Sequence, residues 1–275
     1  MKHLALITIL LALAGCAPRA EASGGFTVTA AFYPVYLAAA NIADGAENMS
    51  LTLLTRPTSG CLHDYQLTPG ELKAAGAADL VLASGMENFL NRIKTPVFNC
   101  GEGKDEHFWI LPENFMEMAD AIRETLSAAD PANAELYQNN YDKYAASLSV
   151  LAEEMRETMG ELNMRPVITF HEAFGLWAGE YGLNIAASIH REPGTEPTPR
   201  ELAGIIDIVR MMDAAALFAE PQYPDTSARA ISRETGCEVF MLDPIASGPM
   251  DLDYYQIAQR ANLETLRLAL GGTEN

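Results

Sequence analysis

The sequence predicts an α/β protein with two similar lobes, each a mostly parallel sheet flanked by helices, joined by one long helix. Three observations support this fold. Strand-like and helix-like runs alternate along the 275 residues, helical spacing continues without a break over 130–162, and one helix-start pattern occurs on each side of that long run. Strands that alternate with helices are typical of parallel sheets built from βαβ units.

Before residue 130, short apolar runs alternate with runs whose apolar residues recur every three or four positions. The first pattern is typical of buried strands, and the second of helices that bury one face. We expect strands over 26–32, 49–55 and 78–85, and helices over 35–44, 68–77, 87–93 and 112–129.

The middle run keeps its helical spacing throughout, with Asp130 as a candidate N-cap and Pro131 as a candidate first helical residue. The alternation then restarts. We expect strands over 165–170, 183–189, 214–220 and 237–242, and helices over 172–182, 199–212, 227–236 and 254–270.

The repeated helix-start pattern is Thr-Pro-x-Glu-Leu, which begins at Thr68 and again at Thr198. Each copy is a capping box with proline at the first helical position, because the threonine can accept from the third amide while the glutamate reaches back. A strand follows each helix. We therefore assign lobes to 26–129 and 163–275, with the linking helix at 130–162.

The start of the chain resembles a secretory signal peptide, with a short basic segment before an apolar run over 4–13 that is too short to span a bilayer. The Leu-Ala-Gly-Cys that follows resembles a bacterial lipobox. We expect removal of 1–15, lipidation of Cys16 and a flexible tether over 16–25, which would place the protein in the periplasm or on the cell surface. Ordinary cleavage near 20–24 is the alternative.

The composition is acidic and rich in apolar residues, with a net charge of −19 and 49% hydrophobic residues. That apolar content supports a sizeable core, and no later apolar run is long enough for a transmembrane helix. The acidic charge argues against nucleic-acid binding, which requires basic patches. It would weakly concentrate cations, although plain solubility explains it equally well.

Three cysteines remain besides Cys16, namely Cys61, Cys100 and Cys237. An exported protein can form disulfides, but an odd number leaves at least one thiol unpaired. The favoured pair is Cys61 with Cys100, which would close a loop of about 40 residues. Cys237 precedes a predicted strand and is expected to pack as a small buried apolar group.

Potential ligand side chains recur where the predicted strands end. His171 and Asp243 each follow a strand directly, while His63 and His107 lie in loops before helices. In open α/β sheets, ligands bind outside the carboxyl ends of the strands. Two facing lobes could therefore supply two ligands each to one cation in the cleft between them.

Three neutral imidazoles and one carboxylate suit Zn²⁺, and a filled set of four favours holding the metal over using it in catalysis. The opposing interpretation is that these are ordinary polar loop residues and that Asp243-Pro244 forms a turn or an N-cap. The spacings match no short metal motif. His190 lies in a polar Pro/Gly loop and is expected to be exposed.

Five segments together resemble the cluster A-I solute-binding proteins of zinc and manganese ABC transporters. They are "CLHDYQLTPGELK" with "ADLVLASGMENFL", "DEHFWILPEN", "FHEAFGLWAGEYGL", "EPTPRELAGIIDIVR" with "ALFAEPQY", and "MLDPIA". The resemblance covers most of the mature chain. It implies a metal site between two lobes, a rigid linking helix and delivery to a membrane permease. The ligands that it implies are His63, His107, His171 and Asp243.

The resemblance also bears on the metal and on the surroundings of the site. In that family a histidine at the third ligand position accompanies zinc and a glutamate accompanies manganese, so His171 favours Zn²⁺. Glu220 matches a family position near the cleft and is interpreted as support for a histidine, with a helix cap or surface residue as the alternative. Cys61 stands unusually close to His63, so a free thiol or a soft ligand is an alternative to the disulfide. The His-rich loop of many zinc members is absent.

Other functions remain open at this point. A manganese-binding member of the same family would use the same four ligands. A zinc hydrolase would use Glu172 or Glu220 as a general base, but no His-Glu-x-x-His occurs and a hydrolase needs an open coordination position. An adhesin or structural lipoprotein would carry its histidines incidentally. We expect a monomeric binding protein and not an enzyme.

Overall fold

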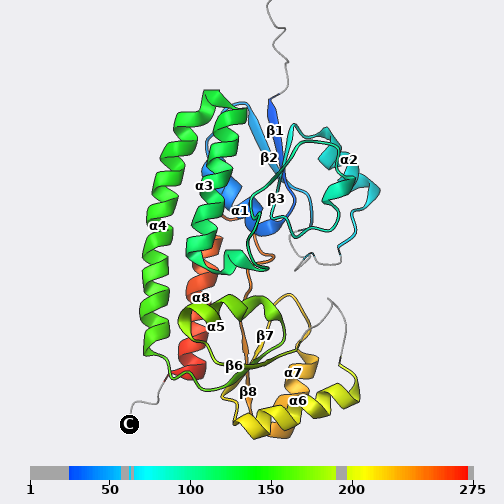
Figure 1. Cartoon of the computed structure of the whole chain (residues 1–275), viewed down its shortest axis with the longest axis vertical. Helices are drawn as coiled ribbons and strands as arrows, with labels where there is room; N and C mark the ends of the chain where they lie inside the picture. Colours follow the sequence, from blue (N-terminus) through cyan, green and yellow to red (C-terminus); the bar gives the residue numbers. More distant parts are fainter. Residues whose placement is uncertain (1–24, 57–61, 63–64, 190–196, 272–275) are drawn as a thin grey trace, which may run out of the picture.

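A computed structural model describes residues 25–56, 62, 65–189 and 197–271, and it contains two parallel sheets with long helices along one side (Figure 1). The predicted fold class is confirmed. Within the described residues no helix is both long and apolar enough to cross a membrane.

The first sheet has four parallel strands in the order β2-β1-β3-β4. Three of these strands were predicted, and the fourth was missed because it is three residues long and only partly buried. The helix predicted over 87–93 is a short 3-10 turn, Leu90–Arg92. The elements are β1 (Phe26–Ala30), α1 (Tyr33–Ala43), β2 (Met49–Leu53), α2 (Pro69–Ala77), β3 (Leu80–Ala83), β4 (Val97–Asn99) and α3 (Pro112–Ala129).

The second sheet repeats this arrangement with the order β6-β5-β7-β8, again all parallel. Both predicted capping boxes are present, at Thr68 and Thr198, so the internal repeat seen in the sequence is a repeat of structure. The elements are β5 (Val167–Thr169), α5 (Gly175–Tyr181), β6 (Ile185–Ser188), α6 (Pro199–Met212), β7 (Ala216–Ala219), α7 (Thr226–Thr235), β8 (Glu238–Met241) and α8 (Tyr254–Leu270).

The long helix α4 spans Ala134–Glu161, which corrects the predicted start at Asp130. Asp130 ends α3, and Pro131–Asn133 form a 3-10 turn before α4 begins. The Asp130 side chain does not cap a helix because its carboxylate accepts hydrogen bonds from the Tyr137 hydroxyl and the Asn133 amide, both at 2.7 Å.

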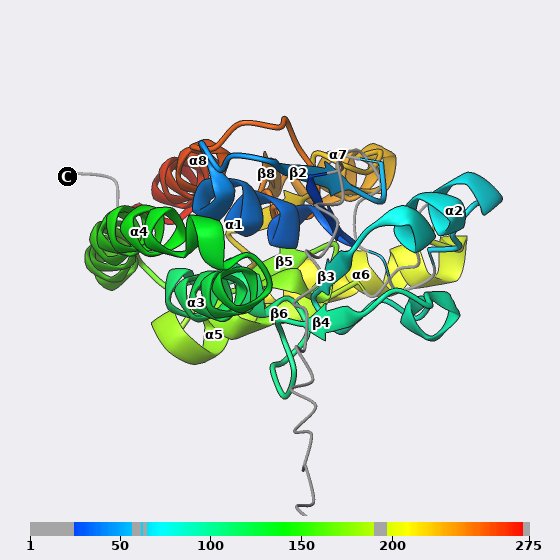
Figure 2. The same ribbon diagram turned by 90° about the horizontal axis from the view of Figure 1, so that it is seen from above.

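Helices α3, α4 and α8 lie together on one side of the molecule (Figures 1 and 2). They bury a single apolar core that contains residues from both lobes, including the stacked rings of Phe115 and Tyr255, whose centroids are 3.8 Å apart. The lobes are therefore joined by shared packing as well as by α4.

A 3-10 turn before α3, Phe108–Ile110, lies between the lobes. Trp109 is fully buried, and its indole N–H donates to the Pro244 carbonyl at 2.8 Å. The Ile110 carbonyl accepts from two side chains of the other lobe, the Trp177 indole at 3.2 Å and the Gln259 amide at 2.8 Å. This turn therefore forms a buried polar connection between the lobes.

Helix α8 presents a row of polar side chains on its buried face. Tyr255, Gln259 and Asn262 are four and three residues apart, so they lie on one side of the helix. The Tyr255 hydroxyl donates to the Trp109 carbonyl at 2.8 Å, while Asn262 exchanges two hydrogen bonds of 2.8 Å with the backbone of Asp243. The same helix face therefore fixes the turn of one lobe and a loop of the other.

The cysteines are only partly as predicted. Cys100 is a free, buried thiol, so the structure does not contain the predicted disulfide with Cys61, a residue that lies outside the described ones. Burial raises the pKa of the Cys100 thiol, which keeps it protonated. Cys237 is confirmed as a buried group within a small apolar cluster behind the second sheet.

Two tryptophans of equal burial allow the polar connection to be tested. Trp109→Phe leaves the Pro244 carbonyl buried without its donor, whereas Trp177→Phe leaves Ile110 still bonded to Gln259. We expect Trp109→Phe to lower the free energy of unfolding by about 1–2 kcal/mol more than Trp177→Phe, because an orphaned buried acceptor carries a desolvation cost. Urea unfolding of the metal-free proteins measures both values. Equal losses would show that this hydrogen bond adds nothing beyond ring packing.

Candidate metal centre

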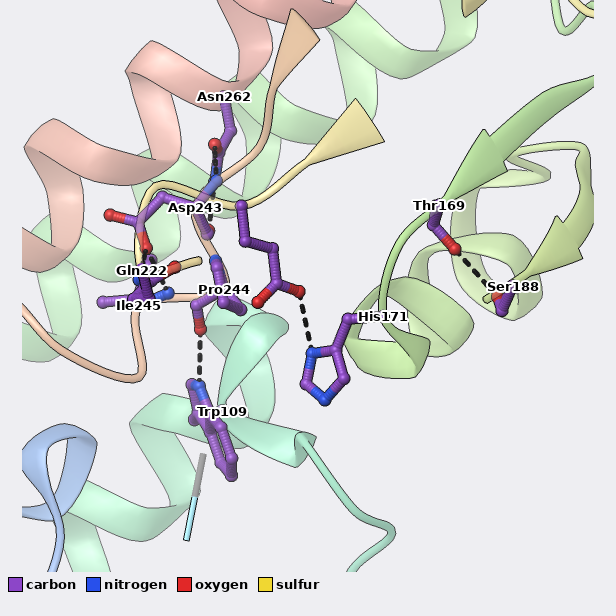
Figure 3. Close-up of polar contacts among 10 residues, drawn as sticks. Trp109, Thr169, His171, Ser188, Gln222, Asp243, Pro244, Ile245 and Asn262 are labelled. Atoms are coloured by element: carbon purple, nitrogen blue, oxygen red, sulfur yellow. Dashed lines mark hydrogen bonds and ion pairs between the residues drawn. The ribbon is translucent and has the colours of Figure 1, made fainter. Parts of the chain in front are cut away.

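The predicted ligands that the structure describes lie beside the ends of strands or beside a turn, and Figure 3 shows two of them, His171 and Asp243. His171 follows β5, Glu220 follows β7 and Asp243 follows β8, so three neighbouring strands of the second sheet deliver them to one edge. His107 comes from the first lobe, directly before the turn that contains Trp109.

His107 is held in an uncommon backbone conformation, with φ at +60° in the left-handed region. Its side chain is buried, and its ring lies 5.3 Å from the Trp109 ring. The ring centroids of His107 and His171 are 4.7 Å apart, with the two planes perpendicular. The fold thus brings together two imidazoles that are 64 positions apart in the chain, one from each lobe.

Glu220 contacts His171 directly. Its Oε1 lies 2.7 Å from Nδ1 of the histidine, and both side chains are almost completely buried. When Nδ1 carries the proton and donates to this carboxylate, Nε2 is the nitrogen with the lone pair that can ligate a metal. Glu220 thus contacts a histidine, and its side chain is buried and not at the surface.

The Glu220 carboxylate is costly to bury. Burial raises its pKa above the ordinary value, and the hydrogen bond to His171 opposes that shift. Its second oxygen, Oε2, is buried and has no hydrogen-bond partner among the described residues. A buried carboxylate with an unpaired oxygen destabilises a fold unless a nearby positive group compensates it. A cation bound at His171 would supply that compensation.

Asp243 is engaged in a different set of contacts. Its Oδ1 accepts from the Ile245 amide and from Gln222 Nε2, and its Oδ2 accepts from the Tyr254 hydroxyl, all at 2.8 Å. Burial, followed by the contact with Asp243, raises the pKa of Tyr254, which therefore remains a donor. Figure 3 shows the Asp243 carboxylate turned away from His171.

Two of the predicted ligands that the structure describes are adjacent to each other. His107 and His171 lie together, but among the described residues no group of three or more His, Cys, Asp and Glu is arranged to hold a metal ion. His63, Cys61 and His190 lie outside the described residues.

Three residues around Asp243 were missed by sequence reasoning, namely Gln222, Tyr254 and Asn262. Gln222 lies two positions after Glu220, which is a weak local signal, but the other two come from α8 and carry none. Glu172, a candidate base for hydrolysis, is exposed in the turn after His171.

Comparison with known proteins supports a family assignment. The family described as "Zinc-uptake complex component A periplasmic" matches residues 28–269. The iron-binding protein YfeA of Yersinia pestis is 28% identical over 266 residues, covering 86% of this chain and 85% of that protein. The zinc uptake protein ZnuA of Brucella abortus is 29% identical over 143 residues, which cover 52% of this chain but 43% of that protein.

A solved structure shares the fold at low identity. The solute-binding protein FpvC of Pseudomonas aeruginosa, in complex with Ni²⁺, superimposes with a TM-score of 0.79 at 24% identity, covering 91% of this chain and 99% of that one. At that identity the likeness concerns the fold alone. Because the family match extends over most of the chain, this protein belongs to the periplasmic component A family of zinc-uptake complexes, whose members are solute-binding proteins and not enzymes.

Proposed function

We propose that this protein captures Zn²⁺ outside the cytoplasm and delivers it to the permease of an ABC importer. The observation that carries this proposal is the buried pair of His107 and His171, one from each lobe, with Glu220 bonded to Nδ1 of His171. Neutral imidazoles whose second nitrogen is fixed by a carboxylate are typical of zinc sites.

The proposed ligand set is His63, His107, His171 and Asp243, with Glu220 orienting His171. Each lobe supplies two of the four ligands, so binding would draw the lobes together around the metal. A nitrogen-rich set favours Zn²⁺ over Mn²⁺, which prefers oxygen ligands. Mn²⁺ remains the second candidate, and FpvC, which shares this fold, has been solved both with Ni²⁺ and with Mn²⁺.

The remaining assignments concern how the site is presented. We propose that Cys16 carries the lipid, that 16–25 form the tether, and that 26–129 and 163–275 are the lobes on either side of the linking segment. A monomer suffices, because both halves of the proposed site come from one chain. The shared core between the lobes favours small lobe movements over wide opening.

The proposal is tested by the melting temperature of the chelator-treated protein with Zn²⁺ and Mn²⁺, separately and in competition. A nanomolar site at micromolar free metal adds about 4 kcal/mol of stability to the folded state. We expect a large shift with Zn²⁺ that excess Mn²⁺ does not displace. A larger shift in melting temperature with Mn²⁺ would make Mn²⁺ the cargo in place of Zn²⁺. No shift with either metal would refute metal capture.

Substitution of the histidines tests the ligand set. We expect His171→Ala and His63→Ala each to weaken Zn²⁺ binding by at least about tenfold, because loss of a ligand should cost no less than loss of its supporting partner. His190→Ala is the matched control, since the sequence places that histidine in a polar loop. Competition with a chromophoric chelator measures the affinities. Wild-type affinity in either ligand variant would refute the assignment.

Substitution of Glu220 tests its orienting role. Glu220→Leu removes the acceptor for Nδ1 and should weaken Zn²⁺ binding by roughly 10- to 100-fold. Glu220→Gln keeps an acceptor oxygen and should weaken Zn²⁺ binding less than Glu220→Leu does. Because the carboxylate is buried with Oε2 unpaired, we expect the Leu variant to unfold at no lower urea concentration than the wild type in the absence of metal. Unchanged affinity in the Leu variant would remove Glu220 from the site.

A further inference from the structure

We propose that Tyr254 and Gln222 compete with the metal for the Asp243 carboxylate and so set how tightly the protein holds its cargo. This inference rests on the proposed function, because it concerns the fourth ligand of that site. It assigns both residues as positioning residues, which act through Asp243 and do not touch the metal.

The hydrogen bonds of Asp243 leave little of its carboxylate for a cation. A carboxylate offers about four lone-pair positions on its two oxygens. Oδ1 uses both of its positions, for the Ile245 amide and for Gln222, while Oδ2 uses one for Tyr254. Gln222 makes this bond while its own Oε1 is buried and has no partner within the part of the chain that the structure describes, so Asp243 is the partner that holds its amide group.

The backbone at this point is fixed from several sides. Asn262 donates to the Asp243 carbonyl and accepts from its amide. The carbonyl of the next residue, Pro244, accepts from Trp109. A movement of Asp243 toward the metal must therefore come mainly from rotation of its side chain, because shifting the backbone would break the connection between the lobes.

Ile245 adds a reason for the carboxylate to stay where it is. This fully buried residue has φ at +58°, a conformation that β-branched residues rarely adopt. Its amide donates to Asp243 Oδ1. The carboxylate thus stabilises a strained turn in the metal-free arrangement, and this stabilisation is lost when the side chain rotates away.

The geometry favours competition over support by the same donors. Ligating carboxylates are often held by hydrogen bonds that strengthen metal binding. Here, however, the carboxylate points away from His171 (Figure 3), and Asp243 does not form a group of ligands with the two histidines. Rotation toward them must break the bond to Tyr254. The same bond, when it re-forms, favours release of the metal to the permease.

The first test is Tyr254→Phe, which removes one donor and keeps the ring. We expect Zn²⁺ affinity to rise by about tenfold, the value of one net hydrogen bond to a charged group at the lower end of its range. Gln222→Met removes the second donor at similar length and should act in the same direction. Both affinities are measured on the full mature protein by competition between Zn²⁺ chelators and the protein.

Tyr33→Phe is the matched control. Its hydroxyl donates to the Pro249 carbonyl in the same loop, and its ring lies 6.1 Å from that of Tyr254, but it has no hydrogen bond to Asp243. Loss of this hydroxyl loosens the loop without freeing the carboxylate, so Zn²⁺ affinity should not rise. An equal rise in Tyr33→Phe would mean that loop mobility sets the affinity and would overturn the proposal.

A double-mutant cycle assigns the effect to Asp243. In an Asp243→Ala background, Tyr254→Phe should leave Zn²⁺ affinity unchanged, because no carboxylate remains to be released. Reduced affinity in Tyr254→Phe alone would refute competition and indicate support instead, and unchanged affinity would also refute competition. If the wild-type protein bound no Zn²⁺, the proposed function itself would fail. If the wild type bound Zn²⁺ but Tyr254→Phe did not bind it more tightly, only the competition proposal would fail.

Discussion

The arrangement of the site depends on the buried turn that contains Trp109. The Trp109 indole donates to the Pro244 carbonyl, and the Trp109 carbonyl accepts from the Tyr255 hydroxyl. The Ile110 carbonyl accepts from Gln259 and Trp177. These donors and acceptors are buried, so each would carry a desolvation cost if the lobes separated at this point. Because His107 directly precedes the turn, the same interactions that join the lobes also bring its ring against His171.

Helix α8 extends this constraint to the second half of the site. One face of the helix carries Tyr255, Gln259 and Asn262, which bind the Trp109 turn and the Asp243 backbone. A row of polar residues on a buried helix face is tolerable only because each makes a hydrogen bond. The Trp109 turn and the Asp243 backbone are therefore both held by α8, which packs on α4.

Several features of the site are energetically unfavourable, and the packed fold holds them in place. Glu220 is buried with an unpaired oxygen, and both His107 and Ile245 adopt left-handed backbone conformations. Features of this kind persist where the surrounding structure fixes them and where function benefits from them. A cation that binds His171 would relieve the cost at Glu220, while the turn at Ile245 is stabilised by the Asp243 carboxylate, which we propose as a further ligand. With the proposed ligand set, metal binding would stabilise the surroundings of Glu220 and destabilise the turn at Ile245.

The sequence alone determined the local features of this protein. Apolar spacing predicted the alternating elements, the capping boxes at Thr68 and Thr198 located the internal repeat, and His171 was placed correctly at the end of a strand, because these signals lie within a few neighbouring residues. Tertiary structure decided the start of α4, the free Cys100, the role of Trp109 and the capture of Asp243 by Gln222 and Tyr254. These depend on contacts between residues that are distant in the chain, and local spacing contains no information about which hydrogen-bond partner a side chain will meet across a packed core.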